Sequence, residues 1–213
     1  MNYLVIMITI FFSFCNTAFA AELQTQRYAP IDVVYHGSIN NDIVTLEPRS
    51  EHTRDEIEGA VVFATPSIRL ASCYLFRWDD SWVHQSIAWK HNNKADYEIN
   101  MIIGDYEKFT KSASSSGTIY LLPARSFRVY ENKGLGIYEC VSKEKITPLA
   151  KIPFSSALQA MKTLGVNVYF LNKAQFKFYI CLPTDKQSKF LINFKQRPKN
   201  EKNTPHAFEK NVS

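Results

Sequence analysis

Two short segments carry side chains that could do chemistry together, and the first is His36-Gly37-Ser38. We expect it to form a turn directly after a strand, so the histidine stands where that strand ends. A histidine there can present a ring nitrogen to a ribose hydroxyl, and the following glycine, which has no Cβ, lets a planar ligand lie against the backbone. The alternative is a strand-end histidine in an ordinary turn.

The second segment is Tyr138-Glu139-Cys140-Val141, in which one carboxylate lies inside an apolar run. Burying an ionised glutamate costs free energy unless the group is paired or faces a cleft. Glu139 therefore either faces solvent on an edge strand or belongs to a site, and the sequence leaves both open. Glu131 is a competing carboxylate in a more polar turn.

A third segment lies between these two. The run Ala60–Thr65 has the composition of a buried strand, and it leads into a helix that carries Ser72 and Tyr74. A tyrosine in that position could stack on a heteroaromatic ligand, although an ordinary core tyrosine has the same appearance in a sequence.

In this order the three segments resemble the His-Tyr-Glu class of ADP-ribosyltransferases, the diphtheria-toxin and poly(ADP-ribose) polymerase type. That class has His-Gly-Ser/Thr after an early strand, a Tyr-Phe-Ala strand leading into a helix with Ser-Ala-x-Tyr, and a glutamate on a late strand. The resemblance spans roughly residues 35–149 and departs at Val62, which stands where the class has tyrosine. The segments also look like a family of uncharacterised bacterial secreted proteins of this type.

The resemblance implies that NAD is the substrate and that Glu139 and His36 are the catalytic residues. His36 would bond the adenosine ribose, the Gly37 backbone would receive the nicotinamide amide, and Tyr74 would pack on the nicotinamide ring. Glu139 would hold the 2′-hydroxyl of the nicotinamide ribose and stabilise the oxocarbenium-like cation. The other expected NAD contacts are Ser38, Phe63, Ser72 and Arg49; Arg49 would bind the pyrophosphate unless it is a surface salt-bridge partner.

The elements that must position these residues are mostly short strands, which predicts an α+β fold with a mixed, mostly antiparallel split β-sheet. One helix is expected from Pro66 with Thr65 as its cap, and another over 155–164, closed by Gly165. The Ser-rich stretch 111–117 and the Gly134–Gly136 region are expected as loop and turn. Strands are expected at 31–35, 43–46, 60–65, 86–89, 99–103, 118–122, 127–130, 137–141, 146–149, 166–171 and 176–181.

The N-terminal segment Met1–Ala20 predicts a removable export signal. It carries no charged side chain, its apolar run is too short to span a bilayer as a helix, and Ala18-Phe19-Ala20 offers a small–x–small cleavage pattern. The mature chain would begin near Ala21 and be secreted or periplasmic, with one domain over 21–195 and a disordered basic tail over 196–213. Lipidation at Cys15 and a buried N-terminal helix are the alternatives.

Charge and cysteine content set further bounds. The net charge of +5 gathers toward the C-terminus, where it is either merely solvated or available to nucleic acid or an acidic membrane face. Cys73, Cys140 and Cys181 lack the spacing of a metal site and allow one disulfide.

Two other functions remain open besides transfer of ADP-ribose to an unknown protein or nucleic-acid acceptor by an effector or toxin. RNA 2′-phosphotransferases resemble the same fold and use a His-Gly-Thr/Ser element with basic residues in place of the late glutamate. A catalytically inactive secreted binding module is the second, with the region of Trp78, Trp82 and Trp89 as its partner-binding surface.

Overall fold

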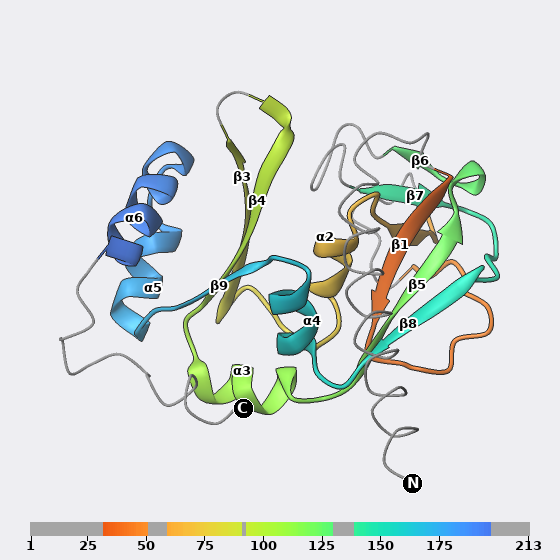
Figure 1. Ribbon diagram of the computed structural model, residues 1–213, viewed down its shortest axis with the longest axis horizontal. Coiled ribbons are helices and arrows are strands. Elements are labelled where there is room, and N and C mark those ends of the chain that lie inside the picture. The colour runs from red at the N-terminus through yellow and green to blue at the C-terminus, as the bar shows by residue number, and fades with distance from the viewer. Residues whose placement is uncertain (1–31, 51–58, 91–92, 130–138, 197–213) are drawn as a thin grey trace, which may run out of the picture. The chain divides into compact units, whose positions relative to one another are not determined.

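The computed structural model describes residues 32–50, 59–90, 93–129 and 139–196 (Figure 1). The expected export signal, Glu131, the Gly134–Gly136 turn and the basic tail beyond Gln196 lie outside these ranges. From Val33 onward the described chain forms one compact unit. No helix in the described ranges is both long enough and apolar enough to cross a membrane.

Three small sheets hold the strands. One has the order β1 (Val33–Ser38), β5 (Gly117–Pro123), β8 (Ala150–Phe154), and a second has the order β2 (Val62–Ala64), β7 (Cys140–Ser142), β6 (Arg128–Val129). Both are wholly antiparallel. In the third, β3 (Val83–Lys90) pairs antiparallel with β4 (Asn93–Ile103), and β4 pairs parallel with β9 (Asn167–Phe170).

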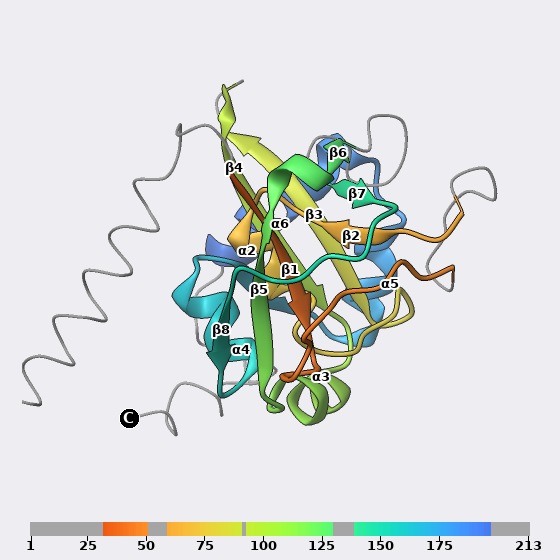
Figure 2. The ribbon, with the colours of Figure 1, turned by 90° about the vertical axis from the view of Figure 1, so that its right-hand side faces the viewer.

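The helices are short. They are α2 (Ile68–Ser72), α3 (Tyr106–Ala113), α4 (Ala157–Thr163), α5 (Lys173–Ile180) and α6 (Thr184–Gln196), with a 3₁₀ turn at Ala124–Ser126. The views in Figures 1 and 2 place α2 and α4 between the β1-β5-β8 sheet and the β3-β4-β9 sheet. The expected α+β class with mostly antiparallel sheets is confirmed.

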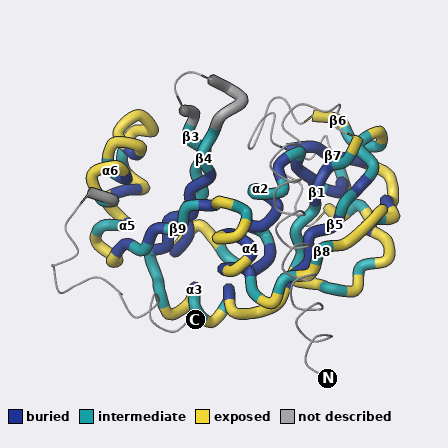
Figure 3. The backbone as a smooth tube through the Cα atoms, viewed as in Figure 1, coloured by how far each residue is buried: buried dark blue, intermediate teal, exposed yellow. Residues whose placement is uncertain are grey.

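The largest core fills the space between those two sheets. Tyr35 and Ile119 enter it from one sheet, Met101 from the other, and Leu70 and Met161 from α2 and α4. Figure 3 shows these inward segments as buried. Burial of this apolar surface is the main favourable contribution to folding.

Two smaller clusters cover the outer faces of the sheets. Val34, Tyr120 and Leu122 pack with Val62 and Cys140 on the far side of β1 and β5. On the far side of β4 and β9, α5 and α6 pack over the sheet, with Ile102, Tyr169, Phe176, Tyr179 and Leu191 in that cluster. Side chains therefore leave each strand alternately toward one cluster and the other.

Four sequence expectations are wrong in detail. His36-Gly37-Ser38 is not a turn, because β1 continues through Ser38 and pairs with β5 along its length. The helix after β2 is capped by Ser67, whose hydroxyl accepts from the Leu70 amide, and not by Thr65.

The other two concern missed helices. The stretch 111–117 begins inside α3, which is capped by Asp105 and buries Phe109 and Ala113 four residues apart. The run 176–181 lies in α5, not a strand, because Asn172 and Gln175 form a capping box and Phe176 and Tyr179 share the buried face.

One expected helix is confirmed, and two expected strands are much shorter than expected. The helix at 155–164 is confirmed as α4, with Gly165 at φ 78° directly after it, a backbone conformation that glycine adopts without strain. The strands at 43–46 and 146–149 reduce to a single bridge between Leu46 and Ile146, and the neighbouring strand β8 begins at Ala150.

Candidate functional site

Gly37 lies against the C-terminal end of α2. A Cβ built on it would stand 1.9 Å from the Ala71 carbonyl oxygen and 3.3 Å from the Tyr74 Cβ. No other residue type fits such a contact without moving the helix, because the obstacle is backbone. Glycine here brings the backbone of β1 and the residues after α2 into direct contact.

In the described part of the chain, β1 and the end of β2 are joined by a single bridge between Tyr35 and Thr65. Tyr35 and Thr65 exchange both backbone hydrogen bonds, at 2.7 and 2.9 Å, and form an isolated bridge. An antiparallel ladder continued from this pair would next join Gly37 to Phe63. Instead the His36 ring lies there, with Nδ1 at 2.8 Å from the Phe63 carbonyl oxygen.

That contact fixes the state of the His36 ring. A carbonyl can only accept, so Nδ1 carries the hydrogen. Burial lowers the pKa of His36 from 6.5; the bond to Phe63 acts in the opposite direction, and the charge of Arg49 lowers the pKa further. The ring is therefore neutral near pH 7, and Nε2 is left as a hydrogen-bond acceptor.

The Gly37 backbone is consequently open on one side. Residues of β1 direct their amide and carbonyl groups alternately toward β5 and β2, and Tyr35 directs its pair toward β2. The amide and carbonyl of Gly37 point the same way as those of Tyr35. Among the described residues no residue of β2 pairs with Gly37, because the pairing ends at Tyr35. We call this break in the pairing between β1 and β2, bounded by Gly37, His36 and Phe63, the seam.

Strand register places Glu139 on the same sheet face as Gly37. Phe63 pairs with Val141 and Ala64 with Cys140, so Glu139 continues the row of Tyr35 and Thr65. It shares a sheet face with Gly37 and Phe63 and is only 7% exposed. From strand spacing and rise, the Gly37 and Glu139 backbones are about 12 Å apart.

Glu139 is thus not on an open solvent face. Its charge adds to burial in raising the pKa of the neighbouring Cys140 thiol. Val141 and Phe63 contact each other beside it in a small apolar cluster. A carboxylate in this setting is a stronger electrostatic source than one in water.

Tyr74 stands at the α2 side of the seam. Its ring packs against Trp78 with centroids 5.9 Å apart, and its hydroxyl donates to the Gln85 Oε1 at 3.1 Å. Both contacts hold the ring in one orientation next to Gly37. Gln85 belongs to β3, so the orientation of Tyr74 is set by the third sheet.

Some expected site residues are not brought to the seam. Ser72 is fully buried, and its hydroxyl donates to the Arg69 carbonyl at 2.6 Å inside α2. The Ser38 hydroxyl accepts from the Asn40 amide at 3.1 Å. The His36 side chain leaves β1 on the face opposite to that of Gly37, and only its Nδ1 edge reaches the seam.

Arg49 is closer to the site than a remote surface residue would be. Its backbone exchanges hydrogen bonds of 3.1 and 3.2 Å with Val61, one residue before β2, and its charge acts on His36. Arg128 was not expected in the site; it pairs with Val141 and so extends the row of Gly37 and Phe63. Only strand register reveals this position.

The tryptophan region is not an open surface where it is described. Trp82 is buried and donates from Nε1 to Asp79 at 3.1 Å, and Trp78 donates to the Cys73 carbonyl at 2.9 Å. Both indoles therefore pack into the fold. The partner-binding surface expected in this region stays a prediction, for which Trp82 offers little exposed area and Trp78 is half-buried.

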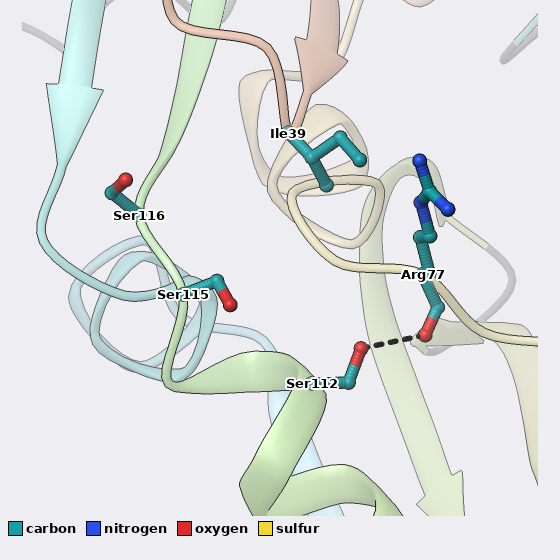
Figure 4. Close-up of a pocket in the computed structure, with 5 residues that line it drawn as sticks. All are labelled: Ile39, Arg77, Ser112, Ser115 and Ser116. Atoms are coloured by element: carbon teal, nitrogen blue, oxygen red, sulfur yellow. Dashed lines mark hydrogen bonds between the residues drawn. The ribbon is translucent and has the colours of Figure 1, made fainter.

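A cavity of about 350 Å³ opens beyond the end of β1 (Figure 4). Ile39 lines it together with Arg77, with Ser112 of α3, and with Ser115 and Ser116 of the segment after α3. Ser112 donates to the Arg77 backbone carbonyl at 2.8 Å, which ties α3 to the segment after α2. The cavity walls contain none of the expected site residues.

The three described cysteines are free thiols: Cys73 and Cys140 are buried and Cys181 is exposed. In the described ranges no group of three histidine, cysteine or acidic residues could hold a metal ion. Comparison with protein-family models, with curated proteins and with solved structures gives no match, so the chemistry of the site has to be argued from its own geometry.

Proposed function

We propose that this chain is a secreted mono-ADP-ribosyltransferase-like protein that cleaves NAD at the seam and transfers ADP-ribose to an acceptor. The observation that carries this is the Gly37 backbone edge that has no β2 partner among the described residues, which stands beside Tyr74 and on one sheet face with the buried Glu139. In the proposed reaction the C–N bond between ribose and nicotinamide breaks and its electron pair leaves with nicotinamide. The acceptor nucleophile bonds the ribose carbon and loses its proton.

The nicotinamide end suits the seam. The N–H and C=O of one residue in an antiparallel strand point to the same side, so Gly37 offers a donor and an acceptor side by side. A primary carboxamide carries the complementary pair. The Tyr74 Cβ lies beside Gly37, and Phe63 shares the sheet face of Gly37, so two aromatic residues border this position, which favours a planar ligand ring there.

Glu139 supplies the charge. The backbone separation of about 12 Å leaves room for a heteroaromatic amide joined to a pentose, with the Glu139 side chain bridging the rest. A carboxylate that accepts from the 2′-hydroxyl holds its negative charge close to the cation that develops as nicotinamide departs. Its surroundings exclude water, which strengthens that interaction.

The remaining roles follow from charge and protonation. Neutral His36 holds the Phe63 carbonyl through Nδ1 and so keeps β1 and β2 apart at Gly37, while its Nε2 lies toward the other face of β1. Arg49, the neighbouring cation, is suited to the pyrophosphate. Export followed by entry into another cell would bring the protein to cytoplasmic NAD, in the manner of an effector or toxin. The acceptor is then a protein or nucleic acid of that cell.

Glu139→Gln tests this function directly. The purified chain is incubated with nicotinamide-labelled NAD, and released nicotinamide is measured beside the NAD-induced rise in melting temperature. We expect release to fall by at least about a hundredfold in Glu139→Gln while NAD still stabilises the protein, since only transition-state charge stabilisation is removed. Glu144→Gln, an exposed carboxylate with the same charge change, is the matched control and should leave release unchanged.

Three outcomes would contradict the proposal. No release and no NAD-induced stabilisation by the wild-type chain would favour an inactive binding module. Consumption of NAD only in the presence of RNA carrying a 2′-phosphate would favour the phosphotransferase. Equal loss in both glutamate variants would mean that Glu139 acts only through net charge.

A further inference from the structure

The outer faces of α5 and α6 combine exposed apolar side chains with lysines. Phe178, Ile180 and Ile192 are 59%, 40% and 55% exposed, although each is large and apolar. Single exposed apolar residues are ordinary, but three on one helical hairpin with a common charge are not. Figures 1 and 3 show this hairpin beyond the third sheet, with much of α6 exposed.

The charge of the hairpin is one-sided. Between Lys173 and Gln196 the only acidic residue is Asp185. The basic residues in the same stretch are Lys173, Lys177, Lys186, Lys189 and Lys195. On the helix surface Ile180 lies one turn after Lys177 and Ile192 one turn after Lys189, so apolar groups and ammonium groups share the outer faces.

The inner faces are already occupied. Phe176, Tyr179 and Leu191 pack onto the sheet, and Phe190 stacks on Phe194 with ring centroids 6.3 Å apart. Phe178 packs against the edge of this group, with its centroid 6.1 Å from that of Phe190. The outer apolar groups are therefore not required to hold the hairpin together.

We infer that the outer face of the α5–α6 hairpin binds the surface of an anionic lipid bilayer. Lysines interleaved with large apolar side chains on helices that lie along a surface are the pattern of interfacial membrane binding. Ammonium groups meet the anionic head groups, while Ile180 and Ile192 enter the head-group and acyl boundary. This surface is separate from the seam and does not depend on NAD chemistry.

Two other occupants fit less well. Bases of a nucleic acid stack on aromatic rings, whereas Ile180 and Ile192 are aliphatic and Phe190 and Phe194 already stack on each other. An acidic protein partner would need a surface of complementary shape, whereas these side chains project separately from two helices. A bilayer accepts single projecting groups without a matching shape.

Vesicle sedimentation tests the inference with the full chain. Vesicles of phosphatidylcholine alone are compared with vesicles that also contain phosphatidylglycerol, at low and high salt. We expect stronger partitioning to the anionic vesicles, and weaker partitioning as salt rises, because salt screens the lysines. The segment Met1–Ala20 carries no charge, so any contribution from it should be the same for both vesicle types.

Paired variants locate the surface. Lys173→Gln with Lys177→Gln should lower partitioning to anionic vesicles about thirtyfold, since each lysine near such a surface contributes about fivefold. Ile180→Ser with Ile192→Ser should lower it on the order of tenfold. The matched controls change exposed groups elsewhere and should have little effect: Lys111→Gln with Lys143→Gln, and Val44→Ser with Leu149→Ser.

The inference is overturned by equal partitioning to both vesicle types or by equal losses in hairpin and control variants. Binding to an RNA oligonucleotide or to polyglutamate in place of vesicles would overturn it as well. Melting temperatures of the variants should stay within a few degrees of the wild type, because every substituted group is exposed.

Discussion

His36 can be replaced in two ways that separate its two nitrogen atoms. Asparagine places its amide nitrogen the same number of bonds from the backbone as Nδ1, so His36→Asn can keep the hydrogen bond to the Phe63 carbonyl while it removes Nε2. His36→Ala removes both. In His36→Ala the Phe63 carbonyl loses the hydrogen bond from Nδ1, and the Gly37 amide is the nearest backbone donor in register with it.

We expect the seam to close in His36→Ala. Loss of that hydrogen bond costs about 1–3 kcal/mol, and a new bond from Gly37 recovers most of it, so the free energy of unfolding should change by less than about 1 kcal/mol. NAD affinity should nevertheless fall by about tenfold to a hundredfold, because Gly37 would no longer offer its amide to the ligand. If the Gly37 amide at the seam is the main determinant of NAD affinity, His36→Asn should retain most of that affinity.

Amide hydrogen exchange by NMR checks the structural step, and calorimetric titration with NAD checks the affinity. The Gly37 amide should exchange quickly in the wild type and in His36→Asn, and it should become protected in His36→Ala. If His36→Asn loses as much affinity as His36→Ala while the Gly37 amide stays open in both, the ring acts on the ligand through Nε2. The idea that it holds the strands apart would then be wrong.

The lowered pKa of His36 predicts that folding stability depends on pH, and His36→Asn tests this. Burial lowers the pKa of His36 below 6.5, so the unfolded chain binds a proton at a higher pH than the folded chain does. Stability therefore falls as pH drops through the window between 6.5 and the lowered value, and it levels off below that value. His36→Asn should flatten this part of the stability curve, whereas an unchanged slope would assign the effect to other groups.

The remaining predictions concern packing and thiol chemistry. Gly37→Ala should destabilise the protein by about 1–3 kcal/mol or more through its collision with the Ala71 carbonyl, whereas Gly165→Ala meets open space and should cost only about 1 kcal/mol for its positive φ; chemical unfolding compares them. Val62→Tyr should lower the melting temperature without raising NAD affinity, because Val62 is buried in the cluster away from the seam. Of the three described cysteines, Cys181 alone should react rapidly with a thiol reagent under native conditions.

Much of the fold follows from composition. Runs of β-branched and aromatic residues correctly indicate β2, β4, β5 and β9, because such runs suit a buried pleated surface. The partners of those strands do not follow, since the parallel pairing of β9 with β4 depends on how the helices pack between the sheets. The helix α5 was predictable: Asn172 followed by Gln175 is a capping signal that outweighs the apolar run after it.

The candidate site was predictable in its residues and not in its arrangement. His36, Gly37, Tyr74 and Glu139 stand out by type, yet the sequence suggests a turn at His36 because a histidine before glycine often ends a strand. The structure shows that β1 continues through Ser38, whereas its pairing with β2 ends at Tyr35. Both facts depend on register between segments about thirty residues apart or more, which local propensity cannot supply.

Strand alternation also changes the meaning of Val62. Its side chain packs with Val34 and Tyr120 on the face away from Gly37, whereas Phe63, one residue later, shares the face of Gly37 and Val141. An aromatic ring is therefore present at the seam without a tyrosine at position 62. The departure from Tyr-Phe-Ala then bears on the packing of the outer cluster, and the capacity of the seam to hold a planar ring depends on Phe63 and Tyr74.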